Sequence, residues 1–78
     1  MDIPDDLIAL ERAAEEQRAK LAGLGGEERE AQLRAWREAA QAVQAAIADH
    51  AASSGQPRYE LEMAVKKAVR HAEEDTAE

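Results

Sequence analysis

The 78-residue chain contains no cysteine and no phenylalanine, and its aromatic residues are one tryptophan and one tyrosine. The absence of cysteine excludes disulfide bonds, thiolate metal ligands and a cysteine nucleophile. Large aliphatic residues are scarce as well, because Val, Ile and Leu together number 12 whereas alanine alone numbers 19. A chain of this kind can bury only one small core, and small cores often need a second copy of the chain to be stable.

The sequence also lacks an apolar run long enough to cross a lipid bilayer. Acidic residues near the N-terminus (Asp2, Asp5 and Asp6) differ from the basic start of a secretion signal. We therefore expect a cytoplasmic protein that does not insert into membranes. Its formal net charge of −7 opposes nonspecific binding to the phosphates of nucleic acids, so nucleic acid is not the partner we favour.

No arrangement of residues indicates an enzyme. Ser53 and Ser54 lie in a break between helical segments, with no base nearby in sequence to complete a nucleophilic triad. The stretch "GLGG" at 23–26 follows a helical segment and lacks the lysine of a phosphate-binding loop. His50 and His71 stand near predicted helix ends, where the helix dipole favours them without any ligand. We thus expect no catalytic, cofactor-binding or metal-ligating residues and no cofactor.

Two breaks, "GLGG" at 23–26 and "SSGQP" at 53–57, divide the chain into three segments rich in good helix formers. The sequence predicts helices at about 4–22, 27–51 and 57–72 within a single domain at 1–73. We expect residues 74–78 to form a mobile acidic tail. The predicted class is all-α: an antiparallel helical hairpin plus a shorter third helix, similar to a three-helix bundle that dimerisation would complete.

Apolar residues in the first two segments repeat at spacings of three and four, which is typical of helices that pack along one seam. The break between these segments is short, so the helices should lie antiparallel. Pairing residues whose numbers sum to 50 places Ala14 opposite Trp36 and Leu7 opposite Val43, which sets large side chains against small or medium ones. The predicted core consists of Leu7, Leu10, Leu33, Trp36, Val43, Ile47, Leu61 and Val65.

The third segment contains the only basic cluster of the chain. Its helical period places Leu61 and Val65 on the core side, and it places a mixed apolar and basic set on the opposite side. That set, our candidate partner surface, consists of Tyr59, Met63, Lys66, Lys67 and Arg70. Tyrosine and methionine among basic residues are typical of protein interfaces. Two other interpretations are an ordinary solvated face and contact with nucleic acid.

Three stretches, "DIPDDLIALERAA" at 2–14, "LRAWREAAQAVQAAI" at 33–47 and "RYELEMAVKKAVRHAE" at 58–73, resemble small all-helical proteins of GC-rich actinobacteria. The resemblance covers most of the chain. It implies a three-helix fold, and because those proteins have no assigned activity it implies no function for any residue.

The leading functional hypothesis is a noncatalytic protein-interaction or regulatory module that binds an unknown protein partner through helix surfaces and forms a homodimer. The alternative is a nucleic-acid-associated regulator in which the third helix places Lys66, Lys67 and Arg70 on phosphates, as in a helix-turn-helix protein. A third interpretation is that the acidic surface imitates nucleic acid.

Overall fold

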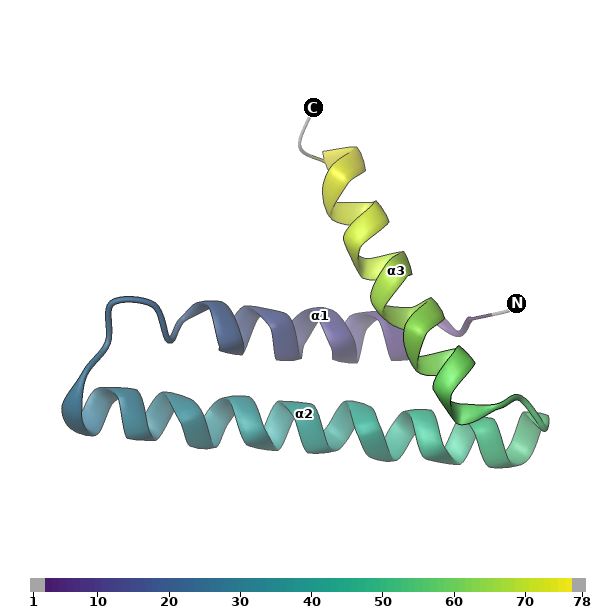
Figure 1. Ribbon diagram of the computed structural model, residues 1–78, viewed down its shortest axis with the longest axis horizontal. Coiled ribbons are helices and arrows are strands. Elements are labelled where there is room, and N and C mark those ends of the chain that lie inside the picture. Colours follow the sequence, from purple (N-terminus) through teal and green to yellow (C-terminus); the bar gives the residue numbers. More distant parts are fainter. Residues whose placement is uncertain (1–2, 77–78) are drawn as a thin grey trace.

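The computed structural model describes residues 3–76, and the side chains of 3–72. Within this part of the chain there are three helices and no strand: α1 (Asp5–Ala19), α2 (Gly26–Ser54) and α3 (Arg58–Thr76). α1 and α2 form an antiparallel hairpin, and α3 crosses it at the end where α1 begins and α2 ends (Figure 1). The all-α class and the hairpin with a third helix are confirmed. None of the described helices is long and apolar enough to span a bilayer.

The C-terminal ends of α1 and α2 differ from the predicted ends by three residues each. α1 ends at Ala19, before the predicted residue 22, because the chain then tightens into a turn that leads to Gly23 at a φ of 81°. α2 continues to Ser54, since the residue that stops it is Gly55, at a φ of 75°. The Gly55 N–H donates to the carbonyl oxygen of Ala51 at 2.9 Å, and this left-handed residue caps the helix.

α3 is longer than predicted. It runs to Thr76 and is therefore longer than α1, although shorter than α2. The prediction that residues 74–76 belong to a mobile acidic tail is wrong, because they are part of this helix. The last two residues of the predicted tail, 77 and 78, lie outside the described part of the chain.

A pair of glutamines shows the register of the hairpin. The Gln32 side-chain amide donates to the Gln17 backbone oxygen at 2.6 Å and to the Gln17 side-chain oxygen at 2.9 Å. These residue numbers sum to 49, within one of the predicted sum of 50. The spacing of apolar residues and the short loop therefore predicted the alignment of α1 with α2 correctly.

The core lies where α3 crosses the hairpin. Leu61 and Val65 of α3 are fully buried against Ile47 of α2, which is fully buried too. Around these three, the core cluster includes Leu7, Ala14, Val43 and Ala51, and Leu10 packs against it while partly buried. All three helices thus contribute large apolar side chains at one end of the hairpin.

Two residues of the predicted core lie elsewhere. Leu33 and Trp36 are only half-buried and are not part of the core cluster. They lie in the half of α2 next to the α1–α2 loop, where α1 is the only helix that covers them (Figure 1). The prediction that Leu33 and Trp36 belong to the core is therefore wrong, and α2 contributes Val43 and Ile47, which α3 also covers.

The uneven position of α3 gives the molecule an open, flat shape. Its dimensions are 43 × 32 × 16 Å and its radius of gyration is 13.9 Å. A compact globular domain of this length would have a radius of gyration of about 11.5 Å. The half of the hairpin next to the loop is therefore a two-helix structure without a third layer.

Candidate functional site

The outer side of α3 exposes an apolar and basic surface. The Tyr59 side chain is 73% exposed and that of Met63 is 51% exposed, and these are the two exposed large hydrophobic residues in the described part of the chain. Lys67 and Arg70 are exposed along the same side of the helix. We call Tyr59, Met63, Lys67 and Arg70 the outer face of α3.

The outer face is held in position by the opposite side of the same helix. Leu61, Val65 and Val69, spaced by four residues, are buried against the hairpin, so the remaining side of α3 must point to solvent. The first turn of α3 is tied to α2 by polar contacts as well. Arg58 donates to the Gln44 side-chain oxygen at 2.9 Å, and the Gln44 amide donates to Glu62 at 3.1 Å.

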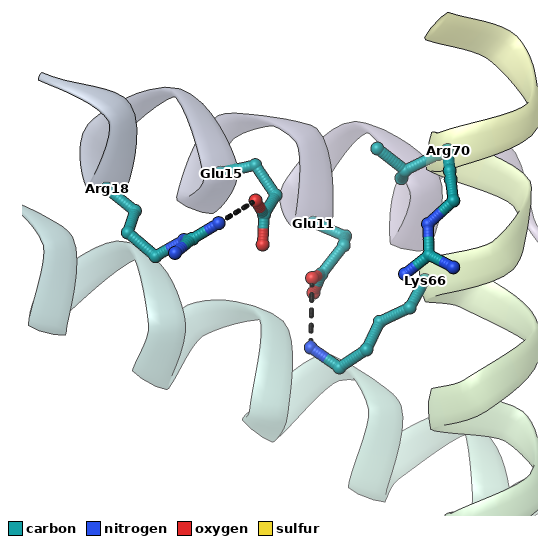
Figure 2. Close-up of a pocket in the computed structure, with 6 residues that line it drawn as sticks. Glu11, Glu15, Arg18, Lys66 and Arg70 are labelled. Atoms are coloured by element: carbon teal, nitrogen blue, oxygen red, sulfur yellow. Dashed lines mark hydrogen bonds and ion pairs between the residues drawn. The ribbon is translucent and has the colours of Figure 1, made fainter. Parts of the chain in front are cut away.

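Lys66 is the predicted surface residue that the structure places differently. Its Nζ donates to Glu11 Oε1 of α1 at 3.1 Å, and the Glu11 side chain is almost completely buried (Figure 2). Lys66 stands at the border between the two sides of α3, and its long chain reaches across to α1 because the helices cross at this point. Four of the five predicted residues therefore share the outer face, and the fifth neutralises a buried carboxylate.

A shallow pocket lies beside this ion pair. It has a volume of about 170 Å³ and lies between α1 and α3 (Figure 2). Its charged lining consists of Glu11, Glu15, Arg18, Lys66 and Arg70. Each carboxylate has a cationic partner, since Arg18 pairs with Glu15 at 3.2 Å and Lys66 with Glu11. Arg70 stands at the border between the outer face and this pocket, and it makes no hydrogen bond or ion pair with any described residue (Figure 2).

Sequence reasoning did not single out Glu11 or the pocket. A signal was present, because Leu7, Glu11 and Ala14 are spaced by four and three and must lie on one side of α1. A carboxylate on the buried side of a helix requires a cationic partner. The partner could not be chosen from the sequence, because the choice depends on where α3 crosses α1.

The remaining polar groups that we considered make local contacts. The Ser53 hydroxyl donates to the His50 backbone oxygen at 3.2 Å, and the Ser54 hydroxyl accepts from the Gln56 N–H at 3.3 Å. Both serines therefore support the end of α2. Within the described residues, no three His, Asp or Glu side chains lie close enough together to hold a metal ion.

Comparison of the chain with known protein families, with curated proteins and with solved structures gives no match. The geometry of the chain itself is therefore the basis for the function proposed below.

Proposed function

We propose that this protein is a noncatalytic interaction module that binds a partner protein on the outer face of α3. The observation that carries the proposal is the exposure of Tyr59 and Met63 next to two cations, Lys67 and Arg70, that have no polar partner within the described chain. Tyrosine, methionine and arginine are enriched at protein interfaces. A rigid helix that exposes them together provides a preformed binding surface.

The charges of the outer face indicate the chemistry of the partner. The face carries two positive charges, whereas the whole chain has a formal charge of −7. A complementary surface is apolar opposite Tyr59 and Met63 and acidic farther along the helix, because Lys67 and Arg70 follow Met63. We therefore propose an acidic protein segment that places an apolar side chain against Tyr59 and Met63.

The structure weakens the case for nucleic acid. A phosphate-binding helix needs several free cations, and affinity increases with the number of phosphates contacted. Lys66 is engaged by Glu11 and Arg58 by Gln44, which leaves Lys67 and Arg70 on the outer face. Two free cations on a chain of this net charge are a small basis for nucleic-acid binding.

The proposal can be tested by site-specific photo-crosslinking in the native cell. A photoreactive amino acid in place of Met63 should form an adduct with an acidic protein. The same amino acid at Ala9, which is exposed on the side of α1 away from the core, should not. The purified partner should then bind the wild-type chain at least tenfold more tightly than the Lys67→Glu, Arg70→Glu double variant, since charge reversal juxtaposes like charges.

A charge-matched control distinguishes the effect of charges on the outer face of α3 from the effect of the net charge of the chain. Arg12 and Arg34 are exposed on α1 and α2, so Arg12→Glu with Arg34→Glu changes the net charge equally and should leave affinity unchanged within about threefold. Equal losses in the two double variants would contradict the proposal. Salt-dependent DNA binding that disappears in the Lys67→Glu, Arg70→Glu variant would overturn it in favour of the nucleic-acid alternative.

A further inference from the structure

A second surface lies on the half of the hairpin that α3 does not cover. Gln44 marks the side of α2 that contacts α3. Toward the loop, the same side of the helix carries Arg37, Leu33 and Glu30, because successive residues from Gln44 to Glu30 are seven, four and three positions apart. α1 covers one edge of this continuation, and α3 does not reach it (Figure 1). A shallow hollow of about 300 Å³ opens there beside the half-buried Trp36. We call residues 15–40 the loop half.

The loop half is nearly neutral, although the chain is strongly acidic. Residues 15–40 contain six acidic and five basic side chains, a net charge of −1, so the rest of the chain carries −6 of the total −7. Two copies that meet through their loop halves keep the acidic ends of their hairpins far apart, where salt screens their repulsion. A second copy of this chain is therefore repelled less at this end than at the other, by formal charge.

Two charged residues make this side of α2 complementary to itself. Glu30 and Arg37 are exposed and lie on either side of Leu33, and neither makes an ion pair with a described residue. An interface with two-fold symmetry requires that residue i of each copy contact residue j of the other. When two α2 helices pack antiparallel so that residues with numbers summing to 67 are opposite each other, each Arg37 faces the Glu30 of the second copy.

We propose that the loop half is a homodimer interface. Two copies pack their α2 helices antiparallel across Leu33 and Trp36, and two Arg37–Glu30 ion pairs flank the apolar contact. The arrangement supplies the missing layer over the open half of each hairpin and brings two hairpins together as a four-helix bundle. It does not involve the outer face of α3, so the dimer and the proposed partner binding stand or fall separately.

Charge reversal of exposed residues tests this interface without disturbing the core. Sedimentation of the wild-type chain at micromolar concentration should show a dimer, and dilution to monomer should red-shift the emission of the single tryptophan, Trp36. Arg37→Glu and Glu30→Arg should each raise the dimer dissociation constant at least tenfold, because the symmetry creates two like-charge pairs. The double variant Glu30→Arg, Arg37→Glu should restore dissociation to within about threefold of wild type.

The Glu30→Arg variant distinguishes specific pairing from general repulsion. It makes each copy less negative, so general repulsion alone predicts tighter association, whereas the proposed pairing predicts weaker association. Matched controls are Asp49→Arg and Arg12→Glu, which make the same charge changes at exposed positions outside the loop half and should not weaken the dimer. A wild-type monomer at micromolar concentration, single reversals without effect, or a double variant that stays weak would overturn the proposal.

Discussion

At the scale of single residues, the pair formed by Glu11 and Lys66 has the largest influence on the surface chemistry. The Glu11 side chain is almost fully removed from water, and the Lys66 ammonium is its only polar partner in the described chain. A buried carboxylate without a partner is costly, so Lys66 is a structural residue and not a binding residue. Its neighbour Lys67 is exposed and remains available for contacts.

The two adjacent lysines should therefore respond differently to substitution. Lys66→Met leaves Glu11 without its cation and should lower the free energy of unfolding by about 1–3 kcal/mol, since Lys66 itself is half-exposed. Lys67→Met should change it by less than about 0.5 kcal/mol. Urea unfolding followed by far-UV circular dichroism measures both. Adding Glu11→Leu to Lys66→Met should recover most of the loss, and similar effects of the two lysine variants would contradict the assignment.

Leu33 and Leu61 are both predicted core residues, but the structure buries them to different extents. Leu61 is completely buried, so Leu61→Ala should lower the free energy of unfolding by about 2–5 kcal/mol. Leu33 is half-buried outside the core cluster, and Leu33→Ala should cost about 1 kcal/mol in the monomer. Urea titrations at a concentration low enough to exclude association make the comparison. Equal losses would show that the loop half is as well packed as the crossing.

At the scale of elements, the turn between α2 and α3 decides where the outer face lies. Gly55 ends α2 in the left-handed conformation, and after Pro57 the chain enters α3 directly. This turn returns α3 onto the end of the hairpin, so that Leu61 and Val65 meet Ile47 while Tyr59 and Met63 point away. The position of the outer face of α3 therefore depends on how α2 ends at Gly55.

Gly55→Ala should destabilise the protein by about 1 kcal/mol, because an L-residue at a φ of 75° brings its Cβ close to its own backbone. Apart from Gly55 and its chain neighbours, nothing lies within 4 Å of a Cβ at this position, so the loss comes from backbone strain and not from a clash. D-alanine introduced by chemical synthesis has no such strain and should stabilise the protein by about 0.4–1 kcal/mol. Thermal and urea unfolding provide the measurement, and a loss with both enantiomers would refute this explanation.

At the scale of the whole molecule, stability is concentrated at one end. The fully buried residues lie at the crossing of the three helices, while the loop half has only two helices. The hairpin is consequently the framework, but α3 supplies the side chains that close its core. This uneven distribution also explains why a nearly neutral surface with the half-buried Leu33 and Trp36 is left for a second copy.

A chain that ends after Gly55 should lose most of its helical circular dichroism. The truncation removes Leu61, Val65 and Val69 and exposes Ile47, so the hairpin no longer has a closed core. A chain that ends after Ala72 keeps every residue of the core cluster and should retain the signal of residues 1–72. A stable hairpin without α3 would show that the α1–α2 seam alone holds the fold.

The sequence by itself determined the class, the three helices and the alignment of the hairpin, because these depend on local helix signals and on a short loop. It also determined which side of α3 would be apolar. The tertiary structure decided where α3 lies along the hairpin, since helical periodicity specifies the side of a helix and not the point at which two helices cross. That point assigned Lys66 to Glu11, left Leu33 and Trp36 half-exposed, and made Tyr59, Met63, Lys67 and Arg70 the available surface.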